Sequence, residues 1–216
     1  MFAAAMILTF SAENYHTICD VLAAIDTGLA SIKAAYGYPP LWKRPNNFET
    51  LVHFILEQQV SLASAFAALT KLKERVGEII PASVLLLTES EMRECYCSRQ
   101  KQAYIRGVAT ALQNGDLDLD AFYTMDDDDV RRQLVALKGI GNWTADVYLM
   151  FVLQRQDIFP AGDLAAINAF RALRADKPAL LKQEIIEGTE LWKPYRTVAT
   201  MMLWHYYLSK RPAPKV

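Results

Sequence analysis

The chain contains little cysteine. Its three cysteines, Cys19, Cys95 and Cys97, are too few for a zinc or iron–sulfur site built from four cysteines, and their spacing fits neither. No cysteine follows Cys97 in residues 98–216, so we expect no such cluster there. We therefore expect three free thiols in a reducing, cytoplasmic compartment.

The chain also lacks a large excess of positive or negative residues, and it lacks long apolar runs. The chain has 23 Lys and Arg residues against 24 Asp and Glu, a formal net charge of −1 at pH 7. Any binding of nucleic acid must therefore use a local basic cluster instead of a surface that is basic overall. No apolar segment is long enough to span a membrane, and residues 1–10 lack the basic start and the cleavage site of a signal peptide. We expect no membrane partner and a packed N-terminal segment.

Strand-like alternation is absent as well, and helical periodicity dominates. A chain of 216 residues with 52% hydrophobic content can bury a core as one domain or two closely packed lobes. The prediction is an all-α fold. His16, His53 and His205 are isolated in sequence and predict no metal cluster. Helices are expected at residues 12–36, 47–58, 61–76, 82–94, 98–113, 118–123, 127–136, 142–154, 163–174 and 193–208, with one or two short helices between them.

The most informative segment runs from Leu137 to Asp163. Gly139 and Gly141 flank Ile140, and two glycines allow a sharp turn with positive φ that exposes backbone N–H groups. A predicted helix precedes this turn, and Asn142 can cap the helix that follows it. A helix N-terminus beside exposed amides is the arrangement that binds phosphate. A dinucleotide fingerprint is not expected, because no third glycine follows at the required spacing and no β-branched strand precedes the turn.

Several segments carry a resemblance to a known family. Residues 137–145 read LKGIGNWTA, and residues 159–163 read FPAGD. They resemble the helix-hairpin-helix DNA glycosylase superfamily, and within it the 3-methyladenine DNA glycosylase II branch, which acts on alkylated bases. The resemblance covers about residues 45 to 208. Three further segments agree: Phe48-Glu49-x-Leu51-Val52 running to Gln58-Gln59-Val60-Ser61, then Ser98 to Gly115, then Trp192-Lys193-Pro194-Tyr195-Arg196.

The resemblance implies a single glycosylase domain over residues 1–216, with two helical lobes flanking an active-site cleft. Lobe A is expected to comprise residues 1–44 and 157–216. Lobe B is expected to comprise residues 45–156 and to contain the helix-hairpin-helix at residues 127–154. Some members of the family have an additional N-terminal β-domain, which we expect this chain to be too short to contain.

Asp163 is the candidate catalytic residue that the resemblance implies. Cleavage of an N-glycosidic bond builds positive charge on the sugar, so a carboxylate near the anomeric carbon stabilises the transition state and can orient the attacking water. Gly162 would leave room for the DNA backbone to approach. An aspartate before a helix that begins at Leu164 is also a common N-cap, and the two roles are compatible.

Trp143 decides the expected reaction type. Family members that also cut the DNA backbone have a lysine at this position, and that lysine forms a Schiff base with the sugar. Tryptophan here implies a monofunctional glycosylase, which removes the base and leaves the strand intact. Lys138 is no substitute nucleophile, since its place in the hairpin directs it to phosphate.

The resemblance places Trp143 and Trp204 in the base pocket. Electron-rich rings would stack there on an alkylated purine that carries positive charge. For a single helical tryptophan, packing in the core is the commoner role, and the family match favours the pocket. Family members often have a tyrosine where this chain has Val147, which predicts a wider or less selective pocket.

Gln59 matches the position whose side chain fills the gap left by a flipped base. It could instead cap the next helix, although Ser61 is the better cap. The carbonyls of Gly139 and Gly141 can hold a structural Na⁺ or K⁺, as in some relatives; no metal held by side chains and no other cofactor are expected. The expected DNA contacts are Gln59, Lys138, Gly139, Ile140, Gly141 and Thr144, with Arg99, Lys101 and Arg106 as further candidate neighbours of phosphate.

The resulting prediction is a monofunctional DNA glycosylase of base excision repair. It would flip alkylated purines of the 3-methyladenine and 7-methylguanine type out of duplex DNA and hydrolyse them, leaving an abasic site. Two alternatives stay open: a glycosylase for deaminated or oxidised bases, and a non-catalytic helix-hairpin-helix module that binds DNA in a repair assembly. The expected partner is double-stranded DNA with alkylated bases. We expect a monomer. The expected location is the bacterial cytoplasm, in association with the nucleoid, or the nucleus if the protein is eukaryotic.

Overall fold

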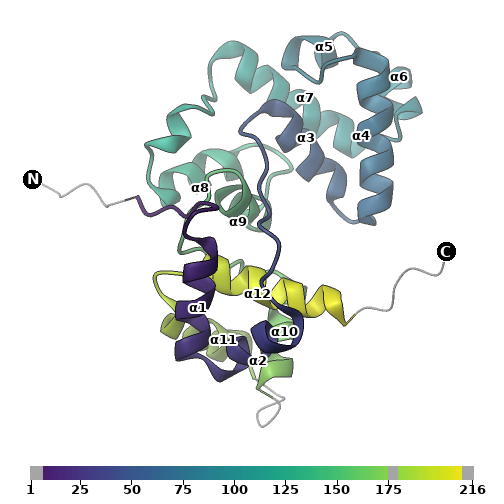
Figure 1. Cartoon of the computed structure of the whole chain (residues 1–216). Coiled ribbons are helices and arrows are strands. Elements are labelled where there is room, and N and C mark those ends of the chain that lie inside the picture. Colours follow the sequence, from purple (N-terminus) through teal and green to yellow (C-terminus); the bar gives the residue numbers. More distant parts are fainter. Residues whose placement is uncertain (1–6, 175–179, 211–216) are drawn as a thin grey trace, which may run out of the picture. The chain divides into compact units, whose positions relative to one another are not determined.

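The computed structural model describes residues 7–174 and 180–210, and within them the fold is all-α, as predicted (Figure 1). These residues form no β-strand, only an isolated bridge between Thr9 and Arg155. None of their helices is long and apolar enough to cross a membrane. The α-helices are α1 (Tyr15–Ile25), α2 (Thr27–Tyr36), α3 (Phe48–Glu57), α4 (Leu62–Val76), α5 (Pro81–Leu85), α6 (Glu89–Glu94), α7 (Arg99–Asn114), α8 (Asp127–Ala136), α9 (Asn142–Phe151), α10 (Leu164–Leu173), α11 (Lys182–Gly188) and α12 (Arg196–Ser209), joined by the short 3-10 helices η1 (Ala121–Tyr123) and η2 (Glu190–Trp192).

The chain divides into two compact units. Unit 1 comprises Met1–Lys43 and Asp146–Val216, and unit 2 comprises Arg44–Ala145. The first boundary lies one residue from the expected one, whereas the second falls inside α9, so residues 146–156 belong to unit 1 instead of lobe B. The segment after α9 joins unit 1 because it bonds to the N-terminal segment: the Phe10 amide donates to the Gln154 carbonyl (3.0 Å).

Unit 1 is built around α12. This helix packs against α1, α2 and α10, so the first and last helices of the described residues lie side by side (Figure 1). Its sequence explains the central position: no charged residue occurs from Thr197 to Trp204, and all of these residues are buried. At the other end of the chain Phe10 is also buried, while the earlier part of the apolar N-terminal segment, residues 1–6, lies outside the described residues.

The helix expected over residues 12–36 is interrupted at Asp26. Its side chain accepts hydrogen bonds from the amides of Gly28 (2.8 Å) and Leu29 (3.1 Å) and so caps α2. The same carboxylate forms a salt bridge with the Arg174 guanidinium (2.5 Å) and accepts a hydrogen bond from the Trp192 indole N–H (2.9 Å). Asp26 is 4% exposed, so these donors replace the water that the buried charge has lost.

Replacement of Asp26 is expected to destabilise the fold in a pH-dependent way. Burial raises the pKa of Asp26, but the bonds from Arg174 and Trp192 outweigh it and leave the pKa below its usual value. The stabilisation is therefore present above the unfolded pKa, about 3.9, and is lost as the pH falls through the folded pKa.

Asp26→Asn should lower the free energy of unfolding by about 3 kcal/mol at pH 7, because Arg174 loses its buried partner. Urea titrations at pH 7, 5 and 3 should show the difference from wild type shrinking with acidification. Glu74→Gln is the matched control: it breaks an exposed ion pair with Lys71 (2.9 Å) and should cost less than about 1 kcal/mol. A difference that stays constant across this pH range would contradict the assignment.

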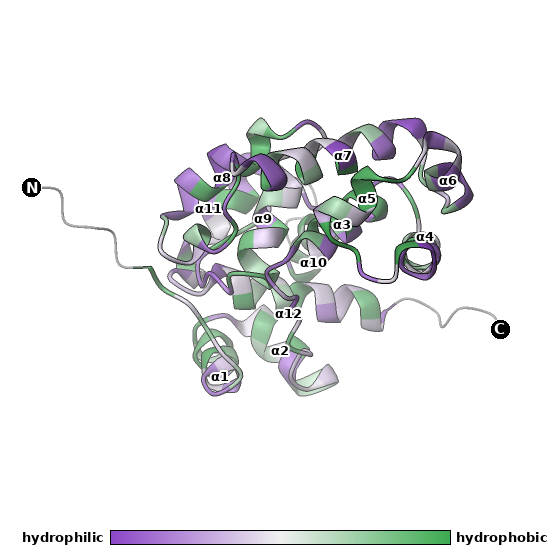
Figure 2. Cartoon of the chain, turned by 90° about the horizontal axis from the view of Figure 1, so that it is seen from above, coloured by the Kyte–Doolittle hydropathy of each residue, from purple (hydrophilic) through white to green (hydrophobic). Residues whose placement is uncertain are grey.

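Unit 2 is organised by α7, which packs against α3, α5 and α6. The helix expected over residues 82–94 is two helices, because Thr88 starts a capping box: its hydroxyl accepts from the Glu91 amide (3.2 Å), and the Glu91 carboxylate accepts from the Thr88 amide (2.8 Å). The Thr-x-x-Glu spacing would have predicted this break. Figure 2 shows α8 mainly in the colours of hydrophilic residues, which agrees with its run of acids and arginines.

Candidate functional site

The hairpin between α8 and α9 depends on Gly139. This residue has φ +93°, and a Cβ on it would lie 2.2 Å from ring atoms of Tyr104. Gly141 differs from the expectation, because its φ is not positive; a Cβ there would meet nothing within 4 Å. Ile140 is buried, and its amide donates to the Leu137 carbonyl (3.0 Å), so this N–H closes the turn and does not face a ligand. The turn therefore requires a glycine at position 139, whereas at position 141 the absence of a side chain leaves unoccupied space beside the backbone.

The N-terminal end of α9 lies at the predicted anion site, and the binding of an anion there stays a prediction. The first bond of the helix runs from the Ala145 amide to the Gly141 carbonyl (3.0 Å), so Gly141 takes the cap position and Asn142 lies in the first turn, contrary to the predicted cap. The first N–H groups of a helix point out along its axis, and no acidic residue occupies this turn. Thr144 is only 3% exposed, so its expected contact with phosphate stays a prediction.

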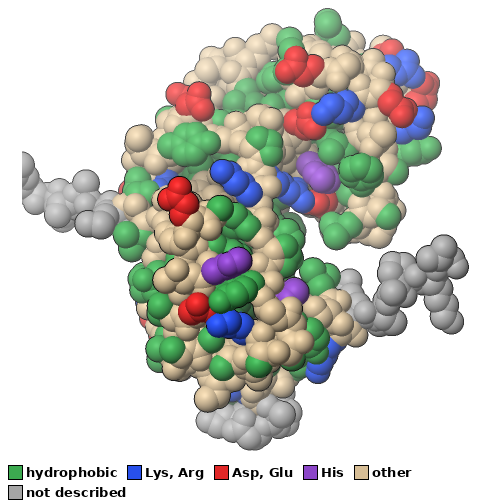
Figure 3. All heavy atoms as spheres, viewed as in Figure 1, with side chains coloured by type: hydrophobic (Ala, Val, Ile, Leu, Met, Phe, Trp, Pro, Cys, Tyr) green, Lys and Arg blue, Asp and Glu red, His purple; other side chains and the backbone are tan. Residues whose placement is uncertain are grey.

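The four basic candidates separate into two pairs. Lys138 and Arg99 are exposed. Lys101 instead donates to the Leu56 carbonyl (2.7 Å) at the end of α3, and Arg106 donates to one carbonyl at the end of α5 and to another in the α5–α6 connection. Burial lowers the pKa of Lys101. Lys101 and Arg106 therefore hold backbone groups, which corrects their expected role at phosphate. On the face shown in Figure 3, basic and acidic side chains are interspersed.

The turn between α3 and α4 is bonded to the hairpin. The Gln58 side-chain amide donates to the Gly139 carbonyl (2.8 Å). Gln59 is exposed and has φ +58°, which is uncommon for a residue other than glycine and frequent at functional sites. Ser61 caps α4 by accepting from the Ser64 amide (3.1 Å), so the alternative role of Gln59 as the cap is excluded. Its role as the wedge stays a prediction.

The Gln58 bond is expected to hold the hairpin in its binding geometry. Gln58→Ala removes the donor, and Gln58→Glu sets a carboxylate against the Gly139 carbonyl, so each should weaken binding of undamaged duplex DNA about fivefold. Fluorescence anisotropy measures this, with Gln113→Ala, an exposed glutamine of α7, as the control. Affinity equal to wild type in both Gln58 variants would show that the bond does not act on the hairpin.

Asp163 stands at the N-terminal end of α10, where Oδ1 accepts from the Ala166 amide (2.7 Å). The same oxygen accepts from the indole N–H of Trp204 (2.9 Å). The predicted N-cap is thus confirmed, and a second donor from α12 fixes the carboxylate. Both donors bind one oxygen, so they set the plane in which the carboxylate lies. A Cβ on Gly162 would meet nothing within 4 Å, which agrees with open space beside Asp163.

Aromatic rings surround Trp204 in unit 1. Trp42 meets it edge to face at 6.2 Å between ring centroids, and Phe151 does so at 5.5 Å. Trp204 is 9% exposed, so this tryptophan packs as a core residue and directs its N–H at Asp163. Sequence reasoning missed this donor and missed Trp42, which precedes α3 in an irregular segment with no periodic signal. Lining of the base pocket by Trp204 and by the half-buried Trp143 stays a prediction.

The described residues contain no group of His, Cys, Asp or Glu that could hold a metal ion. The carbonyls of Gly139 and Gly141 each accept one hydrogen bond, from Gln58 and from the Ala145 amide. A carbonyl has two lone pairs, so each could still coordinate a monovalent cation. That cation stays a prediction.

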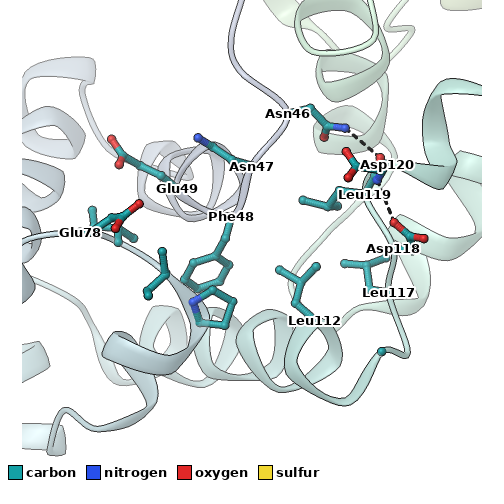
Figure 4. Close-up of a pocket in the computed structure, with 14 residues that line it drawn as sticks. Asn46, Asn47, Phe48, Glu49, Glu78, Leu112, Leu117, Asp118, Leu119 and Asp120 are labelled. Carbon is teal, nitrogen blue, oxygen red and sulfur yellow. Dashed lines mark hydrogen bonds between the residues drawn. The ribbon is translucent and has the colours of Figure 1, made fainter.

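Unit 2 also has a hollow of about 550 Å³ between α3, α5 and the segment after α7 (Figure 4). Its apolar lining residues include Phe48 and Leu117, and its acidic lining residues include Glu78 and Asp118. None of the predicted site residues lines it. Carboxylates in this lining would repel phosphate, so the hollow does not favour a DNA contact.

Comparison with known proteins agrees with this geometry. Residues 52–194 match the model of the HhH-GPD superfamily base excision DNA repair proteins. The DNA-3-methyladenine glycosylase of Bacillus subtilis is 29% identical over 172 residues, which are 74% of this chain and 57% of that protein. A second B. subtilis relative is covered over 65% of its length, so the chain spans less than two thirds of both.

Two solved structures share the fold. The crystal structure of DNA-3-methyladenine glycosidase from Bacillus halodurans has a TM-score of 0.78 and 30% identity, over 93% of this chain and 91% of that one. The Schizosaccharomyces pombe 3-methyladenine DNA glycosylase, solved in complex with abasic DNA, has a TM-score of 0.79 and 25% identity, over 87% and 95%. The resemblance inferred from the motifs is confirmed. The chain therefore belongs to the HhH-GPD superfamily of base excision DNA repair proteins, in which the relatives named here are 3-methyladenine glycosylases.

Proposed function

We propose that this chain is a monofunctional glycosylase that hydrolyses alkylated purines from duplex DNA and leaves an abasic site. The observation that carries the proposal is the carboxylate of Asp163, which α10 and the Trp204 N–H hold in one orientation. Trp143 stands where strand-cutting relatives have a lysine, so no Schiff base forms at this position. The relatives named above support the alkylated base as substrate.

The proposed reaction needs no strong acid from the protein. A purine methylated at N3 or N7 carries a positive charge, so the pair of electrons from the broken N-glycosidic bond leaves it as a neutral base. Positive charge develops on the sugar at the same time, and the Asp163 carboxylate stabilises it electrostatically. Water then adds to the anomeric carbon and loses a proton, which gives the free base and the abasic sugar. The DNA strand stays intact.

Duplex DNA is the proposed partner. The first turn of α9 and the exposed Lys138 would hold phosphate beside the hairpin, and Gln59 would fill the gap left by the flipped nucleotide. The positive φ of Gln59 supports the role of its side chain in that gap, because residues with strained backbone cluster at ligand-binding sites.

Release of bases from methylated duplex DNA tests the proposal. We expect free 3-methyladenine and 7-methylguanine in the soluble fraction, strands that break only after alkali, and no product trapped by borohydride. Release of hypoxanthine or 8-oxoguanine from duplexes that contain those lesions, with no release of 3-methyladenine from methylated DNA, would favour the alternative lesion class. Binding of DNA with no release of any base would favour the non-catalytic module.

A further inference from the structure

The first turns of α4 carry large apolar side chains in solvent. Leu62 is 70% exposed and Phe66 is 63% exposed, one helical turn apart; we call this pair the α4 apolar face. Val60, in the turn before them, is 45% exposed. The core side of α4 is formed by other residues, Ala65, Ala68 and Leu72, so the fold of unit 2 does not require Leu62 or Phe66 to be apolar. Neighbouring exposed apolar side chains commonly mark a binding surface.

The position of the α4 apolar face points to its partner. Leu62 follows Gln59 by three residues and so lies within about 11 Å of it along the chain. Phe66 lies about 6 Å further along the helix. Gln58 ties the same turn to the phosphate-binding hairpin at Gly139 (2.8 Å). With a phosphate on the hairpin and Gln59 in the gap left by the flipped base, the neighbouring base pairs would lie over this face, because each base pair extends the duplex by about 3.4 Å.

The charge around this face also fits DNA. No Asp or Glu lies between Glu57 and Glu74, although acidic residues outnumber basic ones in the chain as a whole. The first turns of α4 thus bring no carboxylate of their own toward a phosphate, and their exposed apolar side chains can cover deoxyribose carbons and base edges.

We propose that the α4 apolar face packs against the sugars and base edges of the duplex beside the flipped nucleotide. This inference rests on the proposed function and adds to it a contact that does not depend on charge. Such a contact would let a nearly neutral protein retain affinity for a lesion as the salt concentration rises, because burial of apolar surface releases no counterions from DNA.

Salt-dependent binding tests the inference. The double variant Leu62→Ser/Phe66→Ser should bind a duplex with a tetrahydrofuran abasic-site analogue about tenfold more weakly than wild type. The slope of log Kd against log salt should stay unchanged. Lys138→Ala should instead reduce the salt slope by about one. Leu86→Ser removes an equally apolar side chain, 85% exposed, from another part of unit 2 and should bind as wild type does.

Affinity of the double variant equal to wild type would overturn the inference, and so would a reduced salt slope like that of Lys138→Ala. Sedimentation of the free proteins gives a third readout: a wild-type dimer that the double variant loses, with unchanged DNA affinity, would assign the face to a second copy and overturn the inference. Failure of the proposed function is distinguishable, because it would appear as no base release by wild type whatever the binding results.

Discussion

Asp163→Asn is expected to lower single-turnover release of 3-methyladenine about a hundredfold to a thousandfold. Asparagine keeps the shape of the side chain, and its amide oxygen can still accept from the Ala166 amide and the Trp204 indole. The variant therefore loses the negative charge while the N-cap is retained. Stability and affinity for abasic-site DNA should change little, so the effect should appear in the chemical step alone.

Asp126→Asn is the matched control for Asp163→Asn. Asp126 caps α8 by accepting from the Asp129 amide (2.8 Å), so the same substitution is made at the same kind of helix position. It should release base as wild type does. Trp204→Phe would keep a ring among Trp42 and Phe151 but remove the donor to Asp163, and should lower release about tenfold. Release by Asp163→Asn at the wild-type rate would refute the catalytic role.

Gly139→Ala is expected to disrupt the hairpin. A side chain at φ +93° is strained, and the new Cβ would lie 2.2 Å from the Tyr104 ring, so the free energy of unfolding should fall by about 3 kcal/mol. A shift of the Gly139 backbone would also disturb the bond from Gln58, so affinity for duplex DNA should fall at least about tenfold. Urea titration and anisotropy measure the two effects.

Gly141→Ala separates these causes, because Gly141 lacks a positive φ and its Cβ would meet nothing. Its stability should match wild type, while its DNA affinity should fall if the strand approaches closely there. Adding Tyr104→Ala to Gly139→Ala should recover part of the lost stability, by removing the clash, and leave the backbone strain. Wild-type stability in the single Gly139→Ala variant would show that the turn relaxes without penalty.

Local signals in the sequence predicted most of the helices. Apolar periodicity placed α3, α4, α7 and α8 within one residue of their observed ends, because such patterns depend on neighbours one or two turns away. The breaks at Asp26 and Thr88 were missed, since a helical pattern can continue across an interruption that a cap imposes. The motif around Gly139 predicted the hairpin, although only one of its two glycines needs a positive φ.

The tertiary structure decided which side chains meet. Trp204 reaches Asp163 across 41 positions of sequence, and Gln58 reaches Gly139 across 81. It also assigned Lys101 and Arg106 to backbone carbonyls, although an exposed and a buried basic residue look alike in sequence. By itself the sequence determined the all-α class, the hairpin, the carboxylate of Asp163 and the tryptophan in place of lysine. Only the fold decided what holds them, because a hydrogen bond between distant residues has no local pattern.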